Sequence, residues 1–369
     1  MPLKSITFNC EVITPMFCGN ATQDAELRPS AIKGALRFWW RAMQNISDVA
    51  KLREQEAEIF GSSDEKWGGR SKVIVEVEKV TSFLPEIPAF TKRQIVNGRP
   101  VTIDLIGTSE NLRSYYSRDL SSNILEYLSY GLHNYNTGTG VQFHRECFKP
   151  GEKFNILIRC SDQEVINIIE EVFKIFAWYG GVGAKTRNGF GQICIIDEKG
   201  NPKFTNPLLI ENNNRRKNAF TAFSNGCQIF SKTHTPPLDS WDKALSEIGW
   251  AYRKSRLKLD LDRSNNLSAK GTHNYENRLY IAHPIEVKGE TIPNFLERHS
   301  KTYFLFVNKL APKQFQGGIL HLPYNYSVEQ CDKFKMNQWK ETAHQKSTPL
   351  ERYNEIHQVM NSNLNTELK

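Results

Sequence analysis

The sequence predicts an α+β fold, because short segments with strand patterns alternate with segments whose apolar residues recur at helical spacing. The predicted order is a strand over residues 6–12, a helix that begins near residue 30, strands over 72–81 and 153–159, a helix over 165–177 and a strand over 193–196. This β-α-β-β-α-β order is typical of one compact α+β domain. With 369 residues, the chain has room for a second domain with its own core.

The first strand and the first helix each follow a clear pattern. Alternate positions from Ile6 to Val12 are apolar, which predicts a half-buried strand that ends before Pro15. Ser30 is a typical N-cap residue, with Pro29 just outside the predicted helix. The helix then has one apolar side, which consists of Ile32, Leu36, Trp39 and Met43.

A cationic stripe runs along the same helix. Lys33, Arg37 and Arg41 follow one another at i, i+4 spacing, where like charges repel. We therefore expect an acidic partner or a polyanion to balance them, although a solvated helix face is the plainer interpretation. Trp40 lies between the two stripes, and the pattern allows both a core position and a platform on which a base stacks.

Residues 180–191 form a glycine-rich loop between a predicted helix and a predicted strand. Glycine permits positive φ and lets backbone N–H groups approach an anion closely. Lys185 and Arg187 add positive charge, and Phe190 offers a ring for stacking. The loop therefore suits a phosphate backbone, while the alternative is a turn that only lets a helix dock on a sheet.

Two familiar phosphate-binding motifs do not match this loop. A Walker A loop needs glycine directly before its lysine, and Ala184 stands there; the order of helix, loop and strand is also reversed. A dinucleotide-binding fingerprint fails because Thr186 occupies the position of its third glycine. These two classes of nucleotide-binding protein are therefore excluded.

Three segments carry a resemblance to a known family. They are residues 14–19, residues 26–43 with the run Leu36-Arg37-Phe38-Trp39-Trp40-Arg41, and the loop of residues 180–191. Together they resemble the RAMP superfamily and, more narrowly, the family of first subunits of the RAMP-module (Cmr) effector complex of type III-B CRISPR systems. The resemblance implies two tandem ferredoxin-like, RRM-related domains with long insertions.

The resemblance also implies a function. It implies a non-catalytic RNA-binding subunit that helps capture target RNA near the 3′ end of the guide RNA in antiviral defence. The implied partners are a CRISPR guide RNA, a single-stranded target RNA and other RAMP subunits, with no metal ion, cofactor or membrane. With Trp40 added as a possible stacking residue, the candidate RNA-binding residues are Lys33, Arg37, Trp40, Arg41, Gly181, Gly183, Lys185, Thr186, Arg187, Asn188, Gly189 and Phe190.

The composition agrees with a nucleic-acid partner. Lys and Arg number 48 against 40 Asp and Glu, which gives a net charge of +8. Seven scattered cysteines without a CxxC pair predict reduced thiols and a cytoplasmic protein. We also expect no membrane span, because no apolar stretch is long enough.

The polar segment 212–217 is the predicted boundary between a first RAMP domain (residues 1–211) and a second, divergent domain (residues 218–369). The first domain contains an insertion at 82–150, with an apparent helix near 124–130 and a mobile-looking loop at 131–140. The second domain is predicted to contain a helix at 241–259 with a basic end, strands at 278–287 and 301–309, a weak echo of the glycine loop at 316–319 and a helical tail after residue 339.

Two other functions stay open at this point. One is a metal-independent RAMP endoribonuclease that processes guide RNA, which would use a histidine as general acid or base. The other is a purely structural cap subunit, which would need no such histidine. The candidate histidines are His133, His144, His273 and His283. His133 and His144 with Cys147 form only a weak zinc pattern, since one HxxC pair lacks a second pair.

Overall fold

The computed structural model describes residues 2–46, 48–79, 85–113, 120–203, 221–224, 227–232, 236–260, 301–322 and 349–364. The fold is a mixed α/β arrangement with antiparallel sheets. The predicted linker at 212–217, the predicted strand at 278–287 and the histidines His273 and His283 lie outside the described residues.

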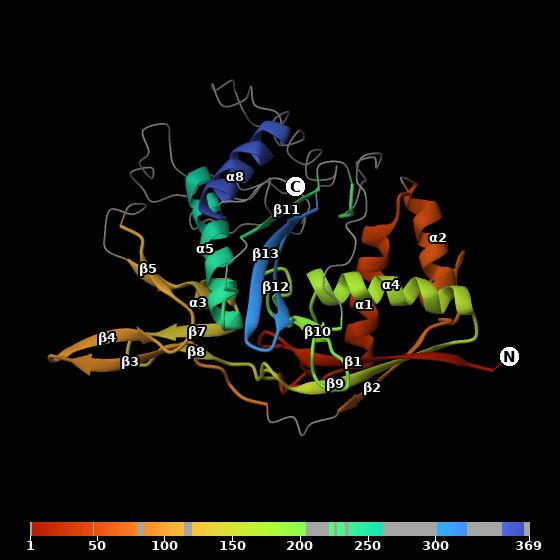
Figure 1. Cartoon of the computed structure of the whole chain (residues 1–369), viewed down its shortest axis with the longest axis horizontal. Helices are drawn as coiled ribbons and strands as arrows, with labels where there is room; N and C mark the ends of the chain where they lie inside the picture. Colours follow the sequence, from red (N-terminus) through yellow and green to blue (C-terminus); the bar gives the residue numbers. More distant parts are fainter. Residues whose placement is uncertain are drawn as a thin grey trace.

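The first unit contains a four-stranded antiparallel sheet in the order β10-β1-β9-β2. Its strands are β1 (Lys4–Val12), β2 (Ile74–Lys79), β9 (Lys153–Cys160) and β10 (Ile193–Ile195). Helices α1 (Pro29–Met43) and α4 (Gln163–Tyr179) cover one face of this sheet (Figure 1). The predicted β-α-β-β-α-β order is therefore confirmed for this unit.

The beginning of α1 differs from the prediction. The N-cap residue is Arg28, which makes no side-chain cap, and Pro29 is the first helical residue. Proline suits that position because its φ is already helical and its missing N–H would have no partner in the first turn. The prediction of Ser30 as N-cap is thus wrong. The structure adds α2 (Val49–Phe60), which the sequence analysis missed although the Asp48 side chain caps it.

The insertion is built from short hairpins and one short helix, α3 (Ile124–Leu128). Its hairpins are β3 (Thr91–Val96) with β4 (Arg99–Asp104), β5 (Ser109–Asn111) with β6 (Ser121–Asn123), and β7 (His133–Asn136) with β8 (Gly140–Phe143). The helix near 124–130 is confirmed. The segment 131–140 is mostly part of the β7–β8 hairpin, so the prediction of an irregular loop there is wrong.

The second unit contains a three-stranded antiparallel sheet in the order β11-β13-β12. Its elements are β11 (Gln228–Ser231), α5 (Trp241–Asp260), β12 (Tyr303–Ala311), β13 (Gln314–His321) and α8 (Pro349–Leu364). The predicted helix at 241–259, the strand at 301–309 and a helix in the tail are confirmed. Residues 316–319 lie inside β13, so they are not a second glycine loop.

The insertion packs mainly with the second unit. One buried core contains the β1 sheet with α1 and α4, and another joins the insertion to α5, β12 and α8. Trp250 Nε1 donates to Thr108 Oγ1 at 2.9 Å, and Arg256 Nη1 donates to the Tyr127 hydroxyl at 2.7 Å. The basic end of α5 therefore holds the insertion in place. From the sequence alone, the positive charges of this end could equally stabilise the helix dipole or form a cationic surface.

The two units meet around the buried side chain of Gln192, at the end of the glycine loop. Its Nε2 donates to the Gly180 carbonyl oxygen at 2.5 Å, and its Oε1 accepts from the Val307 amide at 2.6 Å. Its backbone N–H donates to Thr14 Oγ1 at 3.0 Å. One side chain thus ties α4 and the glycine loop to β12.

We predict that Gln192→Leu lowers the free energy of unfolding by roughly 3 kcal/mol, because it leaves a buried carbonyl and a buried amide without partners. Denaturant unfolding of the full chain measures this loss. Gln163→Leu is the matched control, since Gln163 makes an exposed hydrogen bond to Asn167, and it should change stability by less than about 0.5 kcal/mol. Equal stabilities of the two variants would contradict the central role of Gln192.

Candidate functional site

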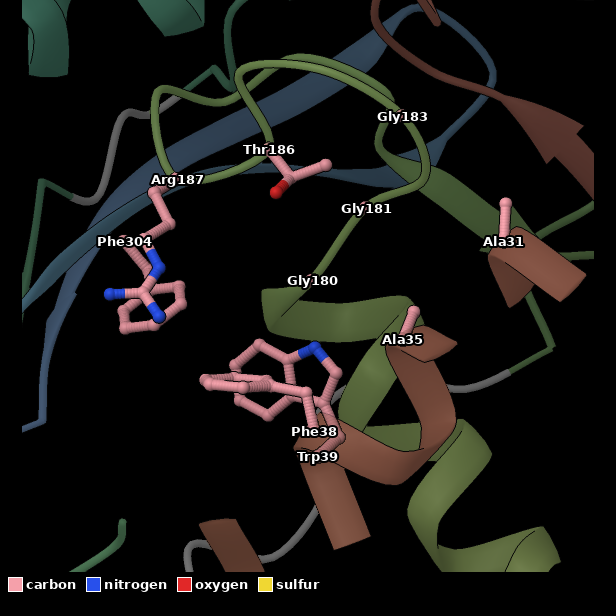
Figure 2. Close-up of a pocket in the computed structure, with 10 residues that line it drawn as sticks. All are labelled: Ala31, Ala35, Phe38, Trp39, Gly180, Gly181, Gly183, Thr186, Arg187 and Phe304. Carbon is pink, nitrogen blue, oxygen red and sulfur yellow. The ribbon is translucent and has the colours of Figure 1, made fainter. Parts of the chain in front are cut away.

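A cavity of about 290 Å³ opens between α1, the glycine loop and β12 (Figure 2). One wall is the first half of α1, where the small side chains of Ala31 and Ala35 leave room. The opposite wall is the glycine loop, and the remaining lining residues are Phe38, Trp39, Gly180, Gly181, Gly183, Thr186, Arg187 and Phe304. This is the place where the two predicted candidate segments come together.

Several glycines of the loop are required by close packing. A Cβ on Gly181 would lie 2.8 Å from the Phe190 carbonyl oxygen. Gly183 has a φ of +93°, and a Cβ there would collide with the carbonyl group of Phe17, just beyond β1. Gly191 has a φ of +70° and packs against the Val182 carbonyl oxygen. The docking interpretation therefore explains these glycines, and the cavity is a consequence of that docking.

The cavity wall offers hydrogen-bond donors. In Figure 2 the Trp39 indole nitrogen points towards Gly180, and the Thr186 hydroxyl points into the cavity. Among the described residues, the backbone N–H groups of Gly181, Gly183 and Thr186 donate to no backbone carbonyl. None of the described lining residues is a carboxylate. Such a set of donors fits an anion.

Arg187 is held at one side of the cavity by β12. Its guanidinium group lies 4.5 Å from the ring centroid of Phe304 and 5.3 Å from that of Phe38, and it donates to the Lys301 carbonyl oxygen. These contacts fix the direction of a side chain that is half-buried. A fixed guanidinium binds a phosphate with less loss of side-chain entropy than a free one.

Further cations gather close to the loop. Lys301 Nζ donates to Asn188 Oδ1 at 2.6 Å and lies 4.2 Å from the ring centroid of Tyr252. Burial, and then the charges of Arg256, Arg187 and Lys185, hold the pKa of Lys301 well below its usual range. Burial and the nearby Arg145 guanidinium likewise lower the pKa of Lys185. Burial is the larger cause of both lowered pKa values and the neighbouring positive groups add to it, so an anion would stabilise the charged forms of both lysines.

Comparison with models of known protein families identifies the family of this chain. A sequence model of the RAMP superfamily matches residues 9–194, from β1 through the glycine loop to β10. The chain belongs to the RAMP superfamily. Over 174 residues it is 25% identical to the CRISPR system Cmr subunit Cmr1-1 of Pyrococcus furiosus, and the alignment covers 46% of this chain and 41% of that protein. The aligned segment thus spans less than half of the curated relative.

Solved structures of similar proteins are more distant in sequence. The crystal structure of Cmr1 from Pyrococcus furiosus in its apo form is 15% identical, with a TM-score of 0.49 over 99% of this chain and 97% of that one. A subunit in the cryo-EM structure of the type III-B Cmr-beta complex bound to cognate target RNA is 14% identical, with a TM-score of 0.45 over 90% of this chain and 99% of that one.

The cationic stripe of this RAMP protein has partners inside the protein. Arg37 Nε and Arg41 Nη1 each lie 2.6 Å from Oε1 of Glu56, a buried carboxylate on α2. Lys33 Nζ donates to the Val73 carbonyl oxygen at 3.2 Å. The acidic partner expected from the spacing is thus a residue of this chain, and contacts of these three cations with RNA stay a prediction.

Trp40 and Phe190 are core residues. Trp40 is 3% exposed and packs on Phe60, with ring centroids 6.3 Å apart. Phe190 is fully buried and stacks on Phe90, with centroids 6.1 Å apart. The expectation that either ring stacks on a base is therefore wrong for this structure, because neither presents a face to solvent. Gly189, also buried, packs against Leu245 of α5.

His133 and His144 of the insertion are the described candidates for an acid–base or metal site. His133 Nε2 lies 2.9 Å from the Glu126 carbonyl oxygen, and burial raises the pKa of the Cys147 thiol to about 12. Across the described residues there is no group of three or more His, Cys, Asp or Glu side chains that could hold a metal ion. None of the described helices is long and apolar enough to cross a bilayer.

Sequence reasoning missed four residues that shape the site, namely Glu56, Gln192, Arg145 and Lys301. Glu56 was within reach, because Asp48 followed by apolar residues at helical spacing predicts α2. The other three act through contacts between residues that are distant in sequence. No local pattern in the chain marks such contacts.

We predict that Trp40→Ala and Phe190→Ala each lower the free energy of unfolding by about 3 to 5 kcal/mol, because each leaves a large cavity in a core. Thermal or denaturant unfolding measures the loss. Tyr135→Ala is the control, since Tyr135 is 65% exposed, and it should have little effect. Stable Trp40 and Phe190 variants would make both rings candidates for base stacking again.

Proposed function

We propose that this protein is a non-catalytic RNA-binding subunit of a type III-B CRISPR ribonucleoprotein, which helps capture target RNA near the 3′ end of the guide RNA in antiviral defence. Membership of the RAMP superfamily and the similarity to Cmr1-1 support this proposal. The observation that carries it is the cavity lined by the glycine loop, with its donors and without a carboxylate among the described lining residues. Guide RNA, target RNA and other RAMP subunits are the proposed partners.

The cavity suits a phosphate of an RNA backbone. Small residues on both walls let the chain approach closely, and the donors come from backbone amides, Thr186 and Arg187. Such contacts recognise the backbone whatever base is attached. Sequence specificity would then come from pairing between guide and target, as it does in other RNA-guided complexes.

The remaining parts of the proposal concern activity and architecture. The described lining of the cavity includes no histidine, which favours a capture role over the endoribonuclease alternative. We also propose a cytoplasmic location, a domain boundary at 212–217 and two tandem ferredoxin-like domains. The order β10-β1-β9-β2 supports the first of these domains, and the β11-β13-β12 sheet with α5 and α8 is the described part of the second.

We predict that Lys185→Gln with Arg187→Gln flattens the salt dependence of binding to single-stranded RNA. Each phosphate interaction removed should reduce the magnitude of the slope of log K against log salt by roughly 0.7, so the double variant should lose roughly 1.4 if the two cations contact different phosphates. Fluorescence anisotropy with an end-labelled oligoribonucleotide at several salt concentrations measures the slope. The same samples, run on a denaturing gel, show whether the RNA stays intact.

The control for this experiment is Lys51→Gln, which removes one exposed charge on α2, away from the cavity. It should leave the slope nearly unchanged. If the double variant shows the same salt slope as the unaltered protein, Lys185 and Arg187 do not contact RNA phosphates. Cleavage of the RNA, abolished by a histidine substitution, would replace the capture role with the endoribonuclease alternative.

RNA affinity should also fall as the pH rises through the range between the free-state and the bound-state pKa of Lys301. In the free protein the pKa of Lys301 is lowered, and a bound phosphate would raise it, so binding takes up protons. Affinity is therefore fullest below the free-state pKa and is lost as the pH rises through the bound-state pKa. Lys301→Arg keeps its positive charge as the pH rises, so the affinity of this variant for RNA should decline less. Calorimetry in buffers of different ionisation enthalpy measures the proton uptake, and zero uptake would contradict the prediction.

A further inference from the structure

Tyr130 is an exposed aromatic residue in the turn between α3 and β7, with 77% of its surface accessible. Its ring meets His133 edge-on, with centroids 6.4 Å apart and an interplanar angle of 85°. The faces of the ring are therefore accessible to a ligand. Trp40 and Phe190, the aromatic candidates of the sequence analysis, are buried and have no such face.

The turn that carries Tyr130 is anchored on the glycine loop. Asn188 Nδ2 donates to the Leu128 carbonyl oxygen at 2.6 Å, at the end of α3. Lys185 Nζ lies beside Gly131, where an added Cβ would be 3.5 Å away from it. Tyr130 is thus next in the chain to a residue that touches the Lys185 ammonium group. The turn that carries this exposed aromatic residue and a cation of the glycine loop therefore lie side by side, although they are more than fifty residues apart in the sequence.

A second cation completes this neighbourhood. Arg145, two residues after the end of β8, is close enough to lower the pKa of Lys185. Its Nε is buried and, within the described residues, has no hydrogen-bond partner. A buried donor without an acceptor is costly, and a phosphate oxygen that reaches it would remove that cost. Lys185 and Arg145 therefore bring two positive charges together next to the turn that carries Tyr130, and neither residue lines the cavity.

We propose that this surface, defined as Tyr130, Lys185 and Arg145, binds one nucleotide of single-stranded RNA, with the base stacked on Tyr130 and the phosphate at the two cations. The inference rests on the proposed RNA-binding function and adds a subsite to it. Thr186 and Arg187 line the cavity, and Lys185 precedes them in the same loop. One strand can therefore run from the cavity across the loop to Tyr130. An acidic peptide would satisfy the cations but would not use the aromatic face.

The test uses the full chain and three RNA probes: a single-stranded oligoribonucleotide, the same backbone with abasic nucleotides, and an RNA duplex. Polyglutamate serves as the acidic peptide for comparison. Tyr130→Ala should weaken binding of the single strand roughly 5- to 150-fold, the loss expected for one base–aromatic stack. Tyr130→Phe keeps the ring and should bind within about twofold of the unaltered protein. On abasic RNA and on the duplex, Tyr130→Ala should bind like the unaltered protein, since neither offers a free base.

Tyr135→Ala is the matched control, because Tyr135 is also an exposed tyrosine of the insertion, in β7. Single-strand binding unchanged in Tyr130→Ala would overturn the subsite and leave the proposed function standing. Equal losses on all three probes, equal losses in the two tyrosine variants, or Tyr130-dependent binding of polyglutamate in place of RNA would also overturn it. Absence of RNA binding by the unaltered protein at any salt would defeat the proposed function itself.

Discussion

The structure depends on the hydrogen bonds of one buried amide, the side chain of Gln192. It bonds the Gly180 carbonyl on one side and the Val307 amide on the other, at 2.5 and 2.6 Å. A buried amide with both ends satisfied favours one arrangement of its neighbours, because any shift leaves a polar group unpaired. The glycine loop is thereby fixed between the two units, and a second link, the nearly buried pair of Lys309 with Glu11, joins β12 to β1.

This constraint also explains how one loop serves packing and binding. Gly183 and Gly191 allow the backbone to fold closely onto the segment after β1 and onto Val182. Other groups of the same loop are left facing outward, with Thr186 and Arg187 towards the cavity and Lys185 towards the insertion. Structural glycines and binding side chains are thus interleaved, and the docking and phosphate-binding interpretations of the loop are compatible.

Sequence patterns predicted the parts of the fold that depend on local periodicity, including α1, α4, α5 and the strands of the first sheet. They also located the glycine loop and its charges, because both are visible within one short stretch of sequence. They failed where burial depends on distant residues. Trp40 lies between two stripes, so periodicity alone did not distinguish core from surface, and Phe60 on an unpredicted helix decides the question. Likewise, the proposed role of Tyr130 in RNA binding depends on the nearby Lys185, and no local sequence pattern connects these two residues.

Hydrogen–deuterium exchange of the full chain with and without single-stranded RNA tests the central claim most directly, namely that the glycine loop is the RNA-binding element. The amides of residues 181–187 and of the turn at 129–133 should exchange more slowly when RNA is bound. Strand β1, at the centre of the first sheet, is the internal reference and should not change. Protection that falls on other segments and leaves residues 181–187 unchanged would contradict the claim.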